Sequence, residues 1–167
     1  MSKNKGIEFE GIVYTGLKIL ISEGKFFINS AYMKLFRGKG YYSLERKKNI
    51  VVDISVEIYI KDPEKYTDIK PSIIIIIECK DYSNPLPIDD VEEFHAKLQQ
   101  IGADNTKGII ITRHSLYQES AINYAKSKGI MLMDWEKYDQ VSLCYNNMEN
   151  KINSNIPTYD IGSWCIN

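Results

Sequence analysis

The sequence lacks the features that mark several common classes of protein. Its longest purely apolar run, Ile73 to Ile77, is far shorter than the roughly 20 residues that a membrane helix needs. The three cysteines, Cys79, Cys144 and Cys165, match no zinc or redox spacing, which favours free thiols in an intracellular protein. The charged N-terminus, MSKNKGIEFEG, precedes no long apolar run, so we expect no targeting segment. These absences predict a cytoplasmic protein with no membrane partner.

The chain also lacks an excess of basic residues. Its 21 Lys and Arg face 22 Asp and Glu, which gives a formal net charge of -1. Proteins that bind nucleic acid usually carry surplus positive charge, at least on one face. The overall balance therefore counts against such a partner, and only a local basic patch can support one. The length of 167 residues suits one compact domain and is short for two.

Hydrophobic periodicity predicts an α/β protein. The expected elements are a helix over 5–23, a weak strand over 26–36, a loop over 36–49, strands over 49–60 and 72–80, a helix with Asp89 as N-cap and an apolar stripe to Ile101, a strand over 107–112, a helix over 117–128 and a strand over 130–133. Their order is α–β–β–β–α–β–α–β. Periodicity fades after Trp135, so we expect one domain over 1–135. Residues 136–167 are expected as an irregular extension packed on that domain or trailing from it.

Two predicted strands differ in their patterns. In 49–60, apolar residues occupy alternate positions from Ile50 onward, and Asp53 and Glu57 fall on the opposite, polar face. In 72–80, an unbroken isoleucine run implies burial on both faces, as in a central strand, and it ends in Glu78, Cys79 and Lys80. The second pattern places charged residues at the mouth of a buried strand.

Glu78 and Lys80 are two residues apart, so they project from the same face of their strand. Read alone, the pair also fits a strand that has simply reached solvent. If the 49–60 strand is its hairpin neighbour, however, Asp53 can lie beside Glu78, and two close carboxylates repel each other unless a cation joins them. Carboxylate oxygens suit Mg²⁺, and the backbone carbonyl of Cys79 offers a further oxygen. Lys80 can then orient or help deprotonate a water, or stabilise developing phosphate charge, as metal-assisted phosphodiester hydrolysis requires.

Four segments carry a family resemblance. GIEFEGIV, NIVVDISVEI, IIIIIECKDY and VEEFHAKLQQIGADNTKGIIIT occur in this order. Together they resemble the PD-(D/E)xK nuclease superfamily, and its Mrr-like restriction endonuclease group in particular, over roughly residues 6–134. The resemblance implies a restriction-endonuclease-like three-layer core, in which helices flank a central mixed sheet of order α-β-β-β-α-β. It also implies metal ligands at Asp53 and Glu78, a catalytic lysine at Lys80 and an auxiliary helix acid at Glu10.

By this resemblance the chain is expected to be a metal-dependent DNA endonuclease in restriction, defence or DNA repair. The implied cofactor is Mg²⁺, with Mn²⁺ as a substitute, and the implied partner is DNA. A homodimer and a separate recognition subunit are further partners that the resemblance suggests. The alternative is a catalytically silent nucleic-acid-binding or assembly module on the same fold, and a third interpretation is an unrelated α/β domain.

Several residues keep two interpretations. Glu10 is also compatible with an exposed helix carboxylate, and Glu8 competes with it for the auxiliary role. A basic cluster that includes Lys39, Arg46, Lys47 and Lys48 fits either a contact with the DNA backbone or the solvated tip of a hairpin. Two lone histidines, His95 and His114, are expected to be polar surface residues, and Glu57 is left out of the site because it lies four residues from Asp53.

Overall fold

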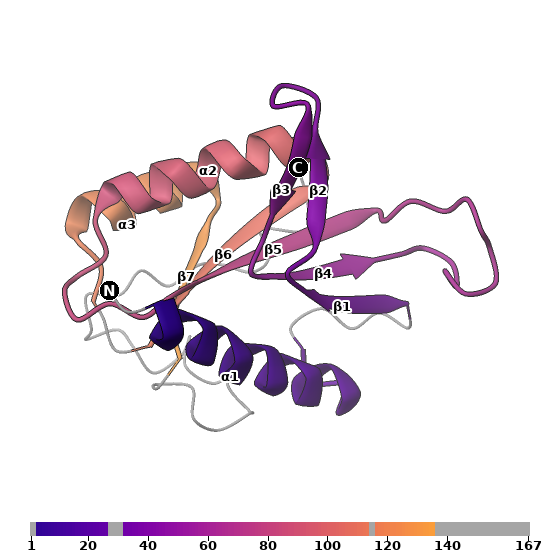
Figure 1. Ribbon diagram of the computed structural model, residues 1–167, viewed down its shortest axis with the longest axis horizontal. Coiled ribbons are helices and arrows are strands. Elements are labelled where there is room, and N and C mark those ends of the chain that lie inside the picture. The colour runs from indigo at the N-terminus through magenta and orange to yellow at the C-terminus, as the bar shows by residue number, and fades with distance from the viewer. Residues whose placement is uncertain (1–2, 27–31, 114–115, 136–167) are drawn as a thin grey trace.

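A five-stranded sheet lies between helices on its two faces, which makes three layers (Figure 1). The structure is a computed structural model that describes residues 3–26, 32–113 and 116–135. Its elements are α1 (Lys3–Ser22), β1 (Met33–Arg37), β2 (Gly40–Ser43), β3 (Lys48–Val51), β4 (Ile54–Ile58), β5 (Ile73–Lys80), α2 (Ile88–Gly102), β6 (Thr106–Thr112), α3 (Glu119–Lys128) and β7 (Met131–Asp134). The predicted fold class is confirmed. The extension predicted over 136–167 lies outside the described residues.

The main sheet has the order β1-β4-β5-β6-β7 and is mixed. Strand β4 is antiparallel to both β1 and β5, whereas β6 is parallel to β5 and to β7. Strand β5 is thus the central strand, as its isoleucine run predicts, and Ile75, Ile76 and Ile77 are fully buried. The two remaining strands, β2 and β3, pair with each other as a separate hairpin.

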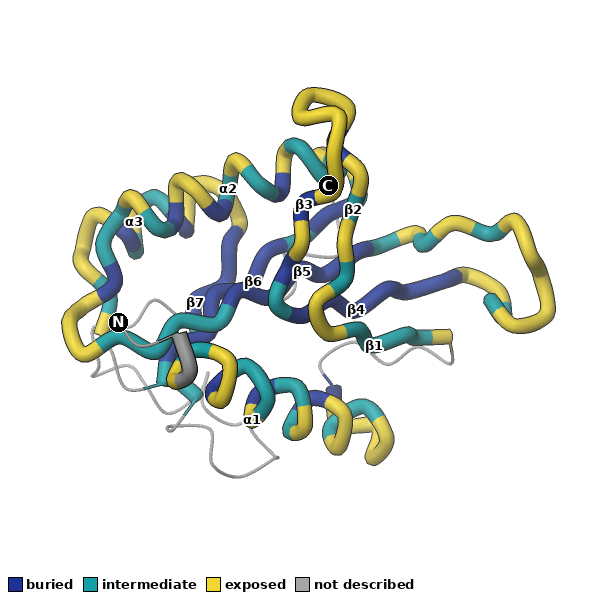
Figure 2. The backbone as a smooth tube through the Cα atoms, viewed as in Figure 1, coloured by how far each residue is buried: buried dark blue, intermediate teal, exposed yellow. Residues whose placement is uncertain are grey.

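Each face of the sheet has its own hydrophobic core. Helix α1 packs Phe9, Val13 and Leu17 against one face. Helices α2 and α3 cover the other, where α2 lies so close to β6 that a Cβ on Gly108 would stand 2.4 Å from Leu98 Cδ1. The buried strands and the exposed hairpin tip stand out in Figure 2. Ile12 has the spacing of this buried stripe, but its side chain is exposed.

The predicted strand over 49–60 is in fact two strands in two different sheets. Strand β3 ends at Val51 and β4 begins at Ile54. At the break, Val52 N donates to the Lys39 carbonyl and Gly38 N donates to the Asp53 carbonyl, so these main-chain groups bond the base of the hairpin. The expected loop over 36–49 is accordingly also wrong, because most of it forms the β2–β3 hairpin. Asp53 lies at the break rather than within a strand.

Smaller differences concern the ends of elements. Helix α2 begins at Ile88 with Pro87 as its N-cap residue and no side-chain cap, so the predicted N-cap at Asp89 is wrong. The weak strand predicted over 26–36 corresponds to β1, and residues 27–31 lie outside the described part of the chain. None of the helices in the described ranges is long and apolar enough to cross a membrane.

Candidate active site

Asp53 reaches the central strand through its side chain. Its Oδ2 accepts a hydrogen bond of 2.8 Å from the Cys79 backbone N–H. The antiparallel pairing of β4 and β5 ends at Ile54↔Ile77. Beyond this pair, the Asp53 carboxylate and not the main chain accepts the hydrogen bond from β5. The break between β3 and β4 therefore lets the Asp53 side chain reach β5. The strands that follow Asp53 and contain Glu78, β4 and β5, are neighbours, as this contact requires.

The Cys79 carbonyl faces the same edge of β5 as Asp53. In a strand the N–H and C=O of one residue point to the same side, and successive residues alternate between the two edges. The Lys80 carbonyl accepts from Arg113 N, which follows β6, so Lys80 turns its main chain to the β6 edge. Cys79 consequently turns both of its main-chain groups to the β4 edge. Val52 precedes β4 on that edge, but its N–H donates to the Lys39 carbonyl. The Cys79 carbonyl therefore does not accept a hydrogen bond from Val52.

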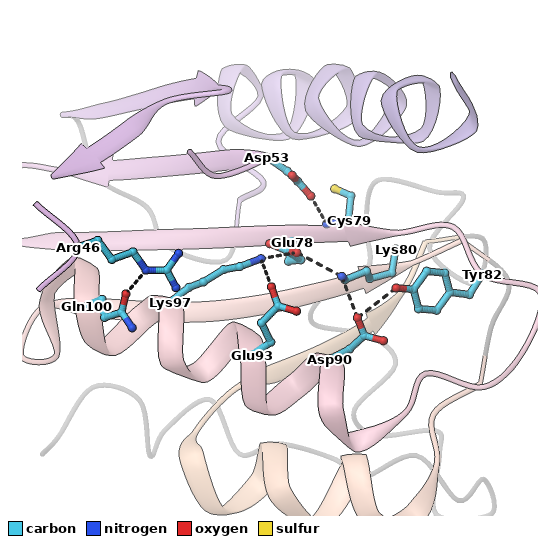
Figure 3. Close-up of polar contacts among 10 residues, drawn as sticks. All are labelled: Arg46, Asp53, Glu78, Cys79, Lys80, Tyr82, Asp90, Glu93, Lys97 and Gln100. Atoms are coloured by element: carbon cyan, nitrogen blue, oxygen red, sulfur yellow. Dashed lines mark hydrogen bonds and ion pairs between the residues drawn. The ribbon is translucent and has the colours of Figure 1, made fainter. Parts of the chain in front are cut away.

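Glu78 and Lys80 project together toward α2. Glu78 is only 8% exposed, and its Oε1 lies 3.3 Å from Lys80 Nζ. Figure 3 shows the Glu78 carboxylate on the α2 side of β5, while the Asp53 carboxylate approaches Cys79 from the β4 side. The structure thus brings Asp53, Glu78 and Lys80 to one short stretch of β5, residues 78–80.

Helix α2 supplies further charged groups that the sequence analysis did not assign to the site. Lys97 Nζ lies 3.1 Å from Glu78 Oε1, and Asp90 Oδ1 lies 2.9 Å from Lys80 Nζ (Figure 3). Tyr82 Oη donates to the same Asp90 oxygen at 3.1 Å. The spacing of seven residues places Asp90 and Lys97 on one helix face, but only the packing of α2 on β5 reveals which strand that face meets.

Burial and neighbouring negative charge disfavour the ionised form of the Asp53 carboxyl group. Loss of solvation, followed by the negative charge of Glu78, raises the pKa of Asp53 to about 6, although the hydrogen bond from Cys79 works in the opposite direction. Burial and the charges of Asp53, Glu10 and Glu78 also raise the pKa of the Cys79 thiol, which stays neutral and is no nucleophile. A buried carboxylate whose ionisation is opposed by a neighbouring carboxylate is typical of a site that a cation neutralises.

Lys80 is held as an ammonium. Burial disfavours its charge, but the Glu78 carboxylate and the hydrogen-bonded Asp90 carboxylate outweigh burial and hold the pKa of Lys80 above its ordinary value. A lysine in this state keeps its proton near neutral pH. It therefore suits donation to an anionic oxygen and not proton abstraction.

Comparison with known proteins identifies the family. Residues 24–140 match the family model Mrr_cat, described as "Restriction endonuclease". This match covers well over half of the 167 residues. The chain belongs to the Mrr-type restriction endonuclease family. Restriction-endonuclease-like domains generally use divalent metal ions. No curated protein sequence matches the chain.

Two solved structures with TM-scores above 0.5 agree on the fold, and a third is reported for comparison. The protein of unknown function AF1548 is 17% identical with a TM-score of 0.51, and the match covers 83% of this chain and 65% of that one. VC1899 from Vibrio cholerae is 13% identical with a TM-score of 0.58 and coverages of 82% and 32%. A repair endonuclease from Pyrococcus abyssi is 17% identical with a TM-score of 0.41 and coverages of 72% and 45%. This restriction endonuclease domain thus spans less than two thirds of the length of each.

Helix α1 adds one acid to the same region of the nuclease domain. Glu10 Oε1 accepts a hydrogen bond of 2.6 Å from Arg37 Nε, and Arg37 also donates to the Ile7 carbonyl. The charge of Glu10 contributes to the raised pKa values of Asp53 and Cys79, so Glu10 acts on the site electrostatically. Glu8, its competitor in the sequence analysis, is exposed.

Glu57 lies in a buried polar network beneath the hairpin. Lys39 Nζ lies 2.6 Å from Glu57 Oε1, and Tyr41 and Tyr59 donate hydrogen bonds to the carboxylate. Burial works against the charge of Glu57, but these three donors lower its pKa. Tyr41 Oη in turn accepts a hydrogen bond of 2.8 Å from the Ser55 hydroxyl. The polar face that the alternation indicated is therefore buried, and it fixes the base of the hairpin to β4.

The basic residues of the hairpin fall into two groups. Lys39 is occupied by Glu57 at the base, whereas Arg46, Lys47 and Lys48 are exposed at the tip. Arg46 donates to Gln100 Oε1 on α2 through its Nε, which ties the tip to the helix (Figure 3). Of these basic residues, only those at the hairpin tip are exposed to solvent. Of the two histidines, His95 Nδ1 lies 3.1 Å from Tyr124 Oη, so it is not a free surface residue, and His114 lies outside the described residues.

The donor chemistry at β5 fits a hard divalent cation, although the ligand set is small. Asp53, Glu78 and the Cys79 carbonyl are all oxygen donors, as Mg²⁺ prefers. Within the described residues, no group of three His, Cys, Asp or Glu side chains is arranged to hold a metal ion. Two carboxylates and a carbonyl remain compatible with Mg²⁺, which usually keeps several waters and substrate oxygens in its coordination shell.

Proposed function

We propose that this chain is a metal-dependent DNA endonuclease that hydrolyses phosphodiester bonds in restriction, defence or DNA repair. The observation that carries the proposal is the hydrogen bond from Cys79 N–H to Asp53, which sets a second carboxylate at the part of β5 that bears Glu78 and Lys80. Membership of the restriction endonuclease family supports the reaction class.

Asp53, Glu78 and the Cys79 carbonyl would hold the ion, Mg²⁺ or Mn²⁺ in its place. When bound, the ion would polarise the scissile phosphate and lower the pKa of a water. Lys80, fixed between Glu78 and Asp90, donates to a phosphate oxygen or orients the attacking water. Glu10 is the auxiliary acid and adds negative charge from α1.

The direct test is cleavage of supercoiled plasmid by the purified chain. With Mg²⁺ or Mn²⁺ we expect conversion to nicked or linear DNA, and with excess EDTA we expect none, because the carboxylates cannot activate water without a cation. Gel electrophoresis over a time course measures the rate. Persistent cleavage in EDTA, or no cleavage with either ion, would contradict the proposal.

We also propose that the tip of the β2–β3 hairpin contacts the DNA backbone. Arg46, Lys47 and Lys48 are exposed there, next to the connection that leads through β3 to Asp53. Cations in this position attract phosphates without reading sequence. Lys39 fixes the base of the hairpin and contributes less to DNA contact, because its ammonium is paired with buried Glu57.

Replacing both Lys47 and Lys48 by alanine is expected to weaken DNA binding about tenfold near 0.1 M salt and to flatten the salt dependence by roughly two units of slope. Fluorescence anisotropy with a labelled duplex measures both quantities. The matched control replaces Lys65 and Lys70, which are exposed in the loop before β5. Equal binding by the two double variants would remove the hairpin from the interface.

A second candidate function is a catalytically silent binding or assembly module on this fold. Its support is the neutralisation of Glu78 by two lysines, which satisfies that carboxylate without an ion. Such a module would bind DNA or a partner chain and cut nothing under any divalent metal. The partners proposed beside DNA, a second copy of the chain and a separate recognition subunit, are tested by light scattering and by affinity purification.

A further inference from the structure

One carboxylate oxygen at the candidate site is shared by two ammonium groups. Glu78 Oε1 lies 3.1 Å from Lys97 Nζ and 3.3 Å from Lys80 Nζ. Figure 3 shows Glu78 between the two lysines, one from its own strand and one from α2. The Lys97 side chain is 20% exposed, and Glu93 lies 3.3 Å from its ammonium group. Lys97 is thus anchored at the site and is not a solvated surface group.

The two lysines differ in what balances their charge. Lys80 has Asp90 as a second, largely buried partner, with the Asp90 side chain 16% exposed. The second partner of Lys97, Glu93, is 67% exposed, and exposed ion pairs are weak because solvent screens them. The charge of Lys97 is therefore directed chiefly at Glu78. A divalent ion on the other oxygen of Glu78, with metal–oxygen bonds near 2 Å, would lie within about 7 Å of this ammonium.

Charge and space at Glu78 both limit the number of ions. Sites with two metals place the ions about 3.5–4 Å apart and share a carboxylate between them. The side of Glu78 that faces α2 is taken by Lys97, which supplies there the positive charge that a second ion would supply. Within the described residues, the two ammonium groups and the Cys79 N–H contact Glu78 Oε1 and Asp53 Oδ2, so the second oxygen of each carboxylate remains for a single ion.

We propose that Lys97 is a built-in cation of this site, which restricts Asp53 and Glu78 to one divalent ion and weakens its binding. The proposal rests on the proposed metal-dependent function, and it concerns a residue outside the Asp–Glu–Lys set. It makes Lys97 a positioning and specificity residue that acts through Glu78.

The test is a calorimetric titration of the full chain with MnCl₂ in the absence of DNA. For wild type we expect one site, and for Lys97→Gln we expect either binding at least about fivefold tighter or a second site, because one opposing charge is gone. Lys97→Arg keeps the charge and is expected to behave as wild type. The matched control is Lys126→Gln, which removes the same charge from an exposed position on α3. Circular dichroism confirms that each variant is folded.

The outcomes separate this inference from the proposed function. Equal affinity and one site in wild type, Lys97→Gln and Lys126→Gln would overturn the role of Lys97 while leaving the nuclease proposal standing. Equal tightening in both glutamine variants would show a general charge effect and would overturn it too. If no variant binds Mn²⁺ and wild type cuts no plasmid, both proposals fail. If Lys97→Gln is unfolded, Lys97→Met takes its place with the same expectation.

Discussion

Replacing Lys80 by alanine is expected to lower the rate of metal-dependent DNA cleavage about 10³-fold, while the fold and most DNA binding persist. Removal of one fixed donor to the charge that develops in a transition state typically costs 10²–10³-fold. The loss should fall on the maximal rate at saturating DNA, since the hairpin cations that would bind the backbone are untouched.

The structure explains why this variant should stay folded. Without Lys80, Glu78 keeps its contact with Lys97 and Asp90 keeps the hydrogen bond from Tyr82, so neither carboxylate is left alone. Lys80→Met, which keeps the length of the side chain but not its charge, should lose the same activity. Lys126→Ala serves as the control. Clear metal-dependent cleavage by Lys80→Ala would exclude Lys80 as the catalytic group.

Replacing Asp53 by asparagine is expected to abolish cleavage and, in EDTA at pH 8, to make the protein more stable. The asparagine oxygen can still accept the Cys79 N–H, but the buried charge that opposes Glu78 is gone. The pKa of Asp53 is raised to about 6, and one pKa unit corresponds to about 1.4 kcal/mol. Because the site is partly solvated, we expect a gain of about 1–2 kcal/mol, or roughly 3–6 °C in Tm.

The sign of this effect fixes its pH dependence. A carboxyl whose folded pKa exceeds its unfolded value binds protons more readily in the folded state. Protonated Asp53 thus favours folding at pH values below its unfolded pKa, and this advantage is lost as the pH rises through about 6. The Tm advantage of Asp53→Asn should therefore be present at pH 8 and vanish near pH 4. Thermal melts at both pH values measure it, and an equal or lower Tm at pH 8 would contradict the raised pKa.

The same raised pKa predicts how wild-type cleavage responds to acid. Protonation of Asp53 removes a ligand charge, so the Mg²⁺ concentration needed for half-maximal cleavage should rise as the pH falls below about 6. Together with the stability gain of Asp53→Asn, this would identify Asp53 as a residue kept for function at the expense of stability.

The central strand and its charged end follow directly from the sequence. A continuous isoleucine run can be buried on both faces only in the middle of a sheet, and Glu78 and Lys80 share a face because strand residues alternate. The structure places both residues where this reasoning expects them. Glu10, the proposed auxiliary acid, lies on the helix that the periodicity predicts, and its charge helps to raise the pKa of Asp53.

The break at Asp53 was beyond sequence reasoning, because alternation continues through it. Ile50 and Val52 are buried in one core and Ile54 in the other, so the apolar pattern is unbroken although the chain changes sheets. Period alone cannot tell which sheet a buried residue serves. Yet this break is what turns the Asp53 carboxylate onto Cys79.

The side-chain contacts between different elements could not be predicted for a similar reason. The separation of four residues from Asp53 keeps Glu57 out of the predicted site, and its partners Lys39 and Tyr41 come from the hairpin that is expected as a loop. Asp90 and Lys97 lie on one face of a correctly predicted helix, but their partners on β5 depend on how α2 packs. Spacing in one element cannot specify contacts between two elements.

The most direct measurement is anomalous X-ray diffraction from a crystal of the protein grown or soaked with Mn²⁺. We predict an anomalous peak with oxygens of Asp53, Glu78 and the Cys79 carbonyl about 2.0–2.3 Å away. A crystal in which Mn²⁺ is bound elsewhere, with Asp53 still on Cys79 and Glu78 still between its two lysines, would contradict a metal-dependent active site at this end of β5.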